Sequence, residues 1–423
     1  MSRIKVLISG GGIAGNALAF WLSKLGHDVT VVERFPNLRT NGLQLDLPGH
    51  GIQVLKRMGL EQAFRAKQAP EEGMQVVDRS GRRRAFFPAN RTGQGLQAFT
   101  TDYEIMRGDL VRLTHDAAKD RVKYVFGTSV DSIENGDDSV QVRFANGKTD
   151  RYDLLVGADG QGSRTRRMML GTDGHDGFYP LKGDFVGYFT VPRPMQEGEE
   201  YIATMYLIPG SRGIMTRRHR PDAFQAYLSC ASESARLNNA RPGDVAEEKA
   251  ALTEIFRGAG WQTEEILEAL QKSDDFYCER MGVVKLDSWS RGRVALVGDA
   301  AYCPSANTGM STTSSVVGAY VLAGEIGRHV GSSKSTGEDA RAGLATALGA
   351  YQDKFEPFMK QVQEGVLEDA NDFWKPSSAF GIEILNYVLG AVSMMRLDLL
   401  SKWILKENVK GWELPEYEEM LEE

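Results

Sequence analysis

The first 33 residues constrain the fold of this chain more than any other stretch. Residues 3–8 alternate between polar and apolar as a short strand does and become apolar throughout at their end, and residues 16–25 have the composition of a helix. The glycines between them have the spacing G-x-G-x-x-G and are Gly10, Gly12 and Gly15. A second apolar run, residues 28–33, ends in the acid Glu33. Strand, glycine turn, helix, strand and acid in this order form the fingerprint of a dinucleotide-binding βαβ unit.

Each part of this fingerprint has a physical role. Gly10 permits the tight turn, Gly12 lets a pyrophosphate approach the backbone, and Gly15 lets the helix pack closely on the strand. The helix N-terminus offers free N–H groups to phosphates. Glu33 lies 18 residues after Gly15, where a carboxylate can accept hydrogen bonds from both ribose hydroxyls. Because an acid disfavours a 2′-phosphate, FAD or NAD is favoured over NADP at this turn. The alternative is a glycine turn that serves packing only.

Composition limits the class of protein. A chain of 423 residues, 42% hydrophobic and 25% charged, is typical of a globular protein with two domains or one large discontinuous domain. The net charge of −7 argues against a nucleic-acid partner. The three cysteines lie far apart and form no C-x-x-C, which excludes a zinc motif and a disulfide framework. They suit a reducing compartment, and the fingerprint leaves no room for a signal peptide before it, so a cytoplasmic location is expected.

Two more strands are predicted to end in an acid. Residues 151–156 run into Gly157-Ala-Asp159-Gly160, and residues 292–297 run into Gly298-Asp299. A loop with Pro304 and Gly309 follows, and then a helix over residues 310–329. Carboxylates at the carboxyl ends of strands, beside a helix N-terminus, lie where open α/β sheets bind ligands.

The middle of the chain changes character. Strands are predicted over residues 183–191, 201–208, 213–217 and 224–229, and helices over residues 244–256 and 263–272. Several strands in succession predict an antiparallel sheet inserted into the α/β domain. Residues 217–220 are predicted to form a hairpin turn, and His219 as a catalytic base is the lesser alternative. The basic residues 79–84 are predicted to form the tip of another hairpin.

Two segments outside the fingerprint carry polar residues with more than one interpretation. Gln44 and Asp46 share one face of an extended piece, which faces either solvent or the cofactor. Arg107 lies near the start of a helix predicted from residue 102 to about residue 118. Because a cation there opposes the helix dipole, its presence favours a phosphate or flavin contact, with a salt bridge to Asp109 as the alternative.

The C-terminal part is predicted to be helical. Residues 341–374 form one helical stretch, with breaks at Pro357 and Pro376. Residues 379–395 are apolar, with Glu383 as their only charge. We interpret them as a helix docked across the domains; weak contact with a membrane surface is second, and a membrane span is the weakest interpretation.

The three motifs, in this order and at these distances, resemble class A flavoprotein monooxygenases of the para-hydroxybenzoate hydroxylase type, over roughly residues 1–330. Arg39, the segment Gly42–Asp46 and the segment Arg107–Leu110 resemble the tetracycline-inactivating and polyketide-tailoring branch. The resemblance implies an α/β fold with a Rossmann-like FAD-binding domain (1–75, 102–177 and 279–335). It further implies an inserted antiparallel-sheet substrate domain (76–101 and 178–278) and a C-terminal helical region (336–423).

The resemblance also implies which residues bind the cofactor. They are Gly10, Gly12, Ala14, Gly15, Glu33, Arg34, Arg39, Asp46, Arg107, Asp159, Asp299, Gly309 and Met310. The glycines would hold the pyrophosphate, Glu33 the adenosine ribose, Arg107 the FAD and Asp299 the ribitol. Arg39 would meet FAD or the nicotinamide cofactor, and Asp159 is implicated in both. The family's Pro-x-x-Gly-Gln-Gly-x-Asn run is absent after Gly-Asp, so the backbone of residues 308–310 is the expected substitute for its ring contacts.

The implied activity is that of a monooxygenase of secondary metabolism or antibiotic modification. FAD would be bound tightly but not covalently, and NADPH would bind transiently and reduce it. O₂ would then form a flavin C4a-hydroperoxide, which hydroxylates an aromatic or polyketide-like molecule, tetracyclines included. Water must be excluded, and no side chain need act as nucleophile and no metal is implied. The substrate residues would be Gln44, Tyr188, Tyr206, Met215, Phe224 and Pro304. Alternatives are a flavin epoxidase, a Baeyer–Villiger enzyme, or a non-catalytic fold relative such as a Rab GDP-dissociation inhibitor. A monomer or homodimer is expected.

Overall fold

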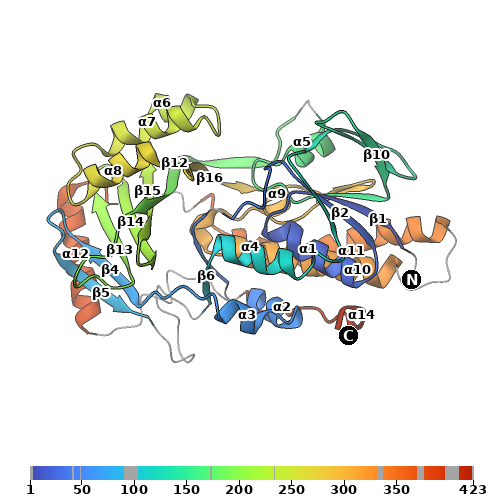
Figure 1. Cartoon of the computed structure of the whole chain (residues 1–423), viewed down its shortest axis with the longest axis horizontal. Helices are drawn as coiled ribbons and strands as arrows, with labels where there is room; N and C mark the ends of the chain where they lie inside the picture. The colour runs from blue at the N-terminus through green and yellow to red at the C-terminus, as the bar shows by residue number, and fades with distance from the viewer. Residues whose placement is uncertain are drawn as a thin grey trace.

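The chain folds into two halves that lie side by side (Figure 1). The computed structural model describes residues 3–40, 42–47, 49–89, 103–171, 174–232, 234–330, 337–368, 376–395 and 409–421. One half contains the N-terminal βαβ unit and most of the long helices. The other half is built on a large sheet with helices on both of its faces (Figure 1).

The first half is a six-stranded sheet of strand order β17-β18-β11-β1-β2-β7. Its strands are β1 (Lys5–Ser9), β2 (Asp28–Glu33), β7 (Lys123–Phe126), β11 (Leu154–Gly157), β17 (Ser290–Arg291) and β18 (Val294–Leu296). All neighbours pair in parallel except β17 with β18. This order confirms the predicted Rossmann-like sheet, because the three strands that end in an acid, β2, β11 and β18, have their carboxyl ends at one edge.

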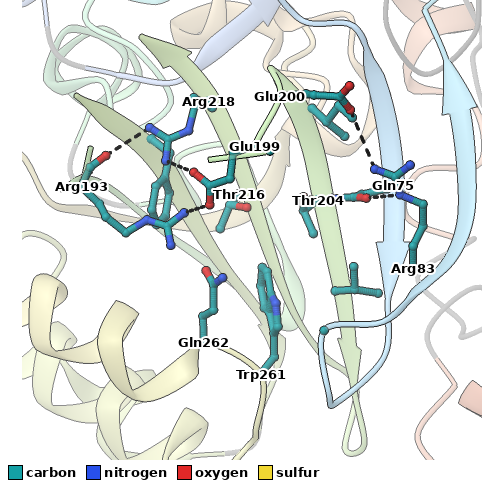
Figure 2. A pocket seen from close by; sticks show the side chains of 15 residues that line it. Gln75, Arg83, Arg193, Glu199, Glu200, Thr204, Thr216, Arg218, Trp261 and Gln262 are labelled. Atoms are coloured by element: carbon teal, nitrogen blue, oxygen red, sulfur yellow. Dashed lines mark hydrogen bonds and ion pairs between the residues drawn. The ribbon is translucent and has the colours of Figure 1, made fainter. Parts of the chain in front are cut away.

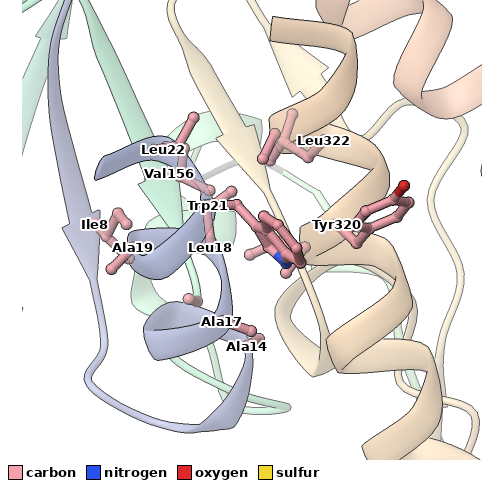
Figure 3. Packing of buried hydrophobic residues seen from close by; sticks show 14 of the residues in the cluster. Ile8, Ala14, Ala17, Leu18, Ala19, Trp21, Leu22, Val156, Tyr320 and Leu322 are labelled. Carbon is pink, nitrogen blue, oxygen red and sulfur yellow. The ribbon is translucent and has the colours of Figure 1, made fainter. Parts of the chain in front are cut away.

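Helix α1 (Ile13–Lys24) packs into the centre of this half. Its residues from Ile13 to Ser23 are all buried, since it lies between the sheet and α10 (Ser311–Val330). Trp21 meets Tyr320 of α10 edge to face, with 5.3 Å between ring centroids (Figure 3). A helix buried on every side is stable only inside such a core, which explains its largely apolar sequence, and its buried Asn16 donates to the carbonyl oxygen of Gly11 at 2.8 Å.

The second half is a seven-stranded sheet of strand order β16-β12-β15-β14-β13-β4-β5. Its strands are β4 (Gly73–Val77), β5 (Arg83–Pro88), β12 (Phe178–Pro192), β13 (Ile202–Ile208), β14 (Arg212–Arg220), β15 (Ala223–Ala231) and β16 (Tyr277–Val284). The predicted antiparallel sheet is confirmed, with one exception: β13 pairs with β4 in parallel. The predicted hairpin turn at residues 217–220 is wrong, because these residues continue β14 and the chain turns only at Pro221.

Helices cover both faces of this sheet. On one face lie α6 (Ala235–Asn239), α7 (Val245–Phe256) and α8 (Thr263–Lys272), whose Leu252 and Ile266 share a core with Ile214 of the sheet. On the other face α12 (Ala379–Met394) packs Leu389 against Val76 and Ala85. The first half lies on this same face, over the β16 end of the sheet (Figure 1).

Short elements connect the halves. The two-stranded sheet of β3 (Gln44–Asp46) and β6 (Glu104–Met106) lies between them, so α4 (Arg107–Asp116) begins five residues later than predicted. The remaining strands form the sheet β10-β9-β8 and are β8 (Val130–Asn135), β9 (Val140–Phe144) and β10 (Thr149–Tyr152). The remaining helices are α2 (His50–Arg57), α3 (Glu61–Arg65), α5 (Arg164–Leu170), α9 (Asp299–Tyr302), η1 (Ala306–Thr308), α11 (Gly337–Gln363) and α14 (Glu418–Leu421).

The C-terminal helices differ from the predicted ones. Pro357 does not break its helix, since α11 runs through it with Phe355 and Phe358 fully buried on either side; core packing outweighs the lost hydrogen bond. The predicted extension of this helix to residue 374 is wrong over residues 364–368, because α11 ends at Gln363 and turns follow it, and residues 369–374 lie outside the described residues. Helix α12 is docked on the protein, but it packs on β5 and β13, both strands of the second half, rather than across the domains as predicted. Across the described ranges of the chain, every helix is too short or too polar to cross a membrane.

Candidate active site

The turn between β1 and α1 is closed by contacts that only glycine permits. Gly10 has a φ of +115°, and a Cβ atom there would lie 2.5 Å from the carbonyl oxygen of Ala158. A Cβ atom on Gly15 would lie 2.0 Å from the carbonyl oxygen of Gly10. A Cβ atom on Gly298 would lie 2.8 Å from the Cβ atom of Ala14. The turn after β18 therefore also packs closely against α1. Strand, turn and helix are therefore packed as a dinucleotide cradle requires.

A cavity of about 170 Å³ opens at this turn, and its wall is rich in cations. Arg34, Arg39 and Arg107 line it together with the glycine turn. A Cβ on Gly12 would lie 3.9 Å from Nη2 of Arg107, which places that guanidinium beside the turn. Burial and the neighbouring Arg107 and Arg34 lower the pKa of Arg39, since like charges crowd there. This donor set fits the pyrophosphate of an adenine dinucleotide.

Two further groups of the cavity support this fit. The buried hydroxyl of Thr128 has no hydrogen-bond partner among the described residues, so a ligand could supply one. The carboxylate of Glu33 is held at the end of β2, because its oxygens accept from the backbone N–H of Gly11 at 2.8 Å and of Phe35 at 3.1 Å. A carboxylate fixed at this point can still accept from ribose hydroxyls.

Asp159 caps the start of α5, a structural role that the sequence did not indicate. Its Oδ1 accepts from the Ser163 hydroxyl at 2.5 Å, and its Oδ2 accepts from the backbone N–H of Arg164 at 2.9 Å and of Thr165 at 3.0 Å. These bonds satisfy the first N–H groups of α5. Its expected contact with FAD and NADPH stays a prediction.

Two buried carboxyl groups lie deeper in the site. Burial raises the pKa of Asp299, the first residue of α9, to about 6, although Arg107 acts against the shift. Burial, helped by the charge of Asp299, raises the pKa of Glu279 to about 7. Sequence reasoning missed Glu279, because its place beside Arg280 in β16 gave no local signal of a site.

The loop after α9 corrects one expectation. Gly309 adopts a left-handed conformation with open space around it, as a turn beside a ligand would. The backbone N–H groups of Thr308, Gly309 and Met310, however, donate to Ser305 O, Ala306 O and Thr308 Oγ1 within the loop. They are not available as the expected replacement for the ring contacts in this conformation. Pro304 is buried at the start of the same loop, and Met310 is buried at its end.

The expected substrate residues divide between the two faces of the seven-stranded sheet. Tyr188 meets Tyr227 edge to face at 5.2 Å and stacks on Tyr277 at 4.9 Å. Met215 is the cross-strand neighbour of Tyr227, so these side chains form one row, which we call the aromatic face. The guanidinium of Arg39 lies 5.2 Å from the ring centre of Tyr277, and this contact places the aromatic face beside the cofactor cavity.

Tyr206 and Phe224 belong to the opposite face, which corrects their assignment to the substrate pocket. Both are buried in the core that α7 and α8 form with the sheet. The hydroxyl of Tyr206 donates to the carbonyl oxygen of Ala259 at 2.6 Å. Since side chains of a strand alternate between its faces, residues of odd and even number on one strand cannot line one pocket.

A buried polar network joins the two halves beside the aromatic face. Arg217 of β14 binds both oxygens of Glu71, at 2.6 and 2.7 Å, and one oxygen of Glu104, at 3.0 Å. Gln44 donates to Glu104 at 2.7 Å, and its backbone N–H donates to the hydroxyl of Tyr227 at 3.4 Å.

One acid of this network, Glu104, has a raised pKa. Burial is the main cause, and the nearby charges of Glu71 and Asp46 add to it. Arg217 acts in the other direction, but the pKa of Glu104 stays well above its ordinary value. Asp46 is the cross-strand neighbour of Glu104, so its carboxylate lies at the edge of this network. Sequence reasoning selected Gln44 and Asp46 but missed Glu71, Glu104 and Arg217, which lie far apart in the chain.

Comparisons with known proteins agree with this geometry. A family model described as FAD binding domain matches residues 3–348. The FAD-dependent monooxygenase asL4 of Sarocladium schorii is 52% identical over 430 aligned residues, covering 100% of both chains. The solved structure of tetracycline destructase Tet(51) matches with a TM-score of 0.75 at 30% identity, over 99% of this chain and 100% of its own. HpxO of Klebsiella pneumoniae, solved with FAD and uric acid, shares the fold with a TM-score of 0.68 at 20% identity, over 95% of each chain.

Proposed function

The chain belongs to the FAD binding domain family of flavin-dependent monooxygenases, and from that premise we propose that it hydroxylates an aromatic or polyketide-like small molecule. The reaction takes one oxygen atom of O₂ into the substrate and reduces the other to water. NADPH supplies the two electrons and, with one proton from solvent, balances the reaction. FAD, when bound, supplies the redox chemistry that joins these steps.

Residues of the cofactor cavity support tight, non-covalent binding of FAD. The glycine turn and Arg107 would hold the pyrophosphate, and Glu33 would hold the adenosine ribose. Asp299 would meet the ribitol from the carboxyl end of β18. The chain has no second G-x-G-x-x-G, so NADPH would dock transiently rather than in a Rossmann site of its own.

The aromatic face is the single observation that carries the substrate class. This face carries the rings of Tyr188 and Tyr227 and the thioether of Met215. It is the side of the sheet that meets the first half of the protein, which contains the cofactor cavity and which we call the cofactor half. Flat, apolar molecules gain most from such a wall, through area burial and ring contacts. This favours hydroxylation of an aromatic ring over epoxidation or Baeyer–Villiger oxidation.

Tyr227 is suited to orient a substrate oxygen. Its hydroxyl accepts the Gln44 N–H, which leaves its own proton for donation to a substrate. Burial raises the pKa of Tyr227 to about 12, so the hydroxyl stays protonated at neutral pH. A phenol or enol oxygen of the substrate is the partner that this donor fits.

A route for small molecules lies between the two halves. A cavity of about 820 Å³ is lined by Gly42 and Met106 from the cofactor side and by Thr190 and Gln225 from the sheet. Its size is within the range that ligand pockets occupy. It supports access of NADPH or substrate to the region near Gly42.

The test begins with a spectrum of the purified protein. Flavin bands near roughly 370 and 450 nm are expected, and consumption of NADPH should rise with one class among phenols, polyketides and tetracyclines. The product should gain one oxygen atom by mass, and its NMR spectrum distinguishes a phenol from an epoxide or a ring-expanded ester. A protein that cannot be loaded with FAD would contradict the proposal and leave a binding protein.

A further inference from the structure

A third cavity lies on the face of the seven-stranded sheet that is turned away from the cofactor half. Its volume is about 200 Å³, and it lies between β13, β14, the segment after β12 and the start of α8 (Figure 2). It shares no lining residue with the cofactor cavity. Strand alternation separates the two: Arg217 points into the network at the cofactor side, whereas the next residue, Arg218, lines this cavity.

Two arginines form one wall of this cavity. The side chain of Arg218 is only 5% exposed and that of Arg193 is 19% exposed. Arg218 Nη2 lies 3.1 Å from Oε2 of Glu199, and Arg193 Nη2 contacts Oε1 of the same carboxylate (Figure 2). Both guanidiniums also lie over the ring of Phe224, at 5.0 and 5.5 Å. The two cations of this wall thus share the Glu199 carboxylate, while Glu200 lies nearer to Arg83 on the opposite side of the cavity.

A buried donor at this wall lacks an acceptor. The Nε–H of Arg193 is buried and has no hydrogen-bond partner in the described part of the protein. The carboxylate of Glu265 is 4.0 Å from this nitrogen, beyond hydrogen-bond distance. A buried guanidinium donor without an acceptor is unfavourable, and an anionic ligand would relieve it.

The floor and the opposite wall are polar and aromatic. Gln75, Thr204 and Thr216 are cross-strand neighbours, and Gln75 donates to Thr204 at 2.9 Å. Together with Arg218 they interrupt the apolar face, whose Ile214 packs into the core under the helices. Trp261 stands at the wall with a φ of +48°, which is strained for a bulky residue and is stabilised by its N–H bond to Arg79 O at 2.9 Å.

We propose that this cavity is a second small-molecule site that binds a small aromatic carboxylate. The carboxylate meets Arg193 and Arg218, where a charge-assisted pair is available, and the ring lies beside Trp261. The hydroxyls of Thr204 and Thr216 complete the polar lining. The site is independent of the proposed oxygenation, because it rests on residues of the opposite face of the sheet.

The test is titration calorimetry of the full chain saturated with FAD, with benzoate as the probe and benzamide as its neutral analogue. Benzoate should bind saturably, and benzamide should bind at least about tenfold more weakly because it lacks the charge. Arg193→Met and Arg218→Met should each weaken benzoate by about tenfold or more. Arg143→Met is the matched control, because Arg143 pairs with Asp131 on the surface of another sheet and should leave binding unchanged.

A second variant locates the site without removing a charge. Thr216→Leu fills the floor of the cavity and should abolish benzoate binding, even if Arg218→Met fails to fold. The flavin spectrum should be unchanged in every folded variant and on addition of benzoate, since the ligand does not reach the cofactor. Equal binding of benzamide, binding that survives Thr216→Leu and Arg193→Met, or no saturable binding of benzoate at all would each overturn the proposal.

Discussion

Replacing Arg217 with methionine tests the buried network that joins the two halves. Arg217 is the cation of this cluster, and the side chains of Glu71 and Glu104 around it are 1% and 4% exposed. Methionine has a similar length and fills the space without the charge. We expect the variant to be less stable, because an acid of the network then loses its partner while it stays buried.

The magnitude follows from the count of charges. With Arg217 present, its positive charge balances one of the two carboxylates. The other acid, Glu104, binds a proton readily because its pKa is raised. Without Arg217 one more carboxyl must be protonated in the folded state, whereas in the unfolded state its pKa is about 4.3. The cost is about 1.4 kcal/mol for each pH unit above 4.3, hence about 4 kcal/mol at pH 7.5 and about 1.6 kcal/mol at pH 5.5. The folded pKa is raised, so the penalty grows as pH rises and fades as pH falls.

Urea unfolding at these two pH values, followed by tryptophan fluorescence at one FAD concentration, measures the difference. Arg220→Met is the matched control: Arg220 lies on the same strand but forms an exposed pair with Asp222, at 3.0 Å, and should cost less than about 1 kcal/mol. The triple variant with Glu71→Gln and Glu104→Gln should recover much of the loss. A loss for Arg217→Met below about 1 kcal/mol at pH 7.5, with no dependence on pH, would refute the reasoning.

Three further predictions concern the cofactor site. Gly15→Ala should abolish retention of FAD, measured as flavin absorbance after gel filtration, because its Cβ would lie 2.0 Å from a backbone oxygen; retained FAD would contradict this packing. Arg107→Met should weaken FAD by about tenfold or more in a fluorescence titration, while Arg112→Met, whose exposed side chain pairs with Asp109, should not. In the FAD-free protein, Asp299→Asn should raise stability by up to about 3 kcal/mol above pH 7 and not at pH 4. The raised pKa of about 6 means that ionising Asp299 costs stability as pH rises, and thermal unfolding at both pH values checks the sign.

Local elements were predictable because their signals are local. The bounds of β2 and α8 match the predicted residues 28–33 and 263–272, since apolar periodicity and flanking polar residues define both. The hairpin predicted at residues 217–220 failed for the opposite reason. A run of cations favours a turn in isolation, but Arg217 and Arg218 stay in the strand because each finds a carboxylate partner on its own face of the sheet.

By itself, the sequence determined the dinucleotide cradle, the three acids at strand ends, and the family. Glycine spacing and strand–helix order act over a few residues, and no distant contact can replace them. Only the tertiary structure decided that Arg217 meets Glu71, 146 residues away, and that Arg193 meets Arg218 across one carboxylate. It also decided that Tyr188 and Tyr227 face the cofactor half while Tyr206 packs under the helices. Which face of a strand is covered, and by what, depends on how the whole sheet docks, and strand periodicity alone does not contain that information.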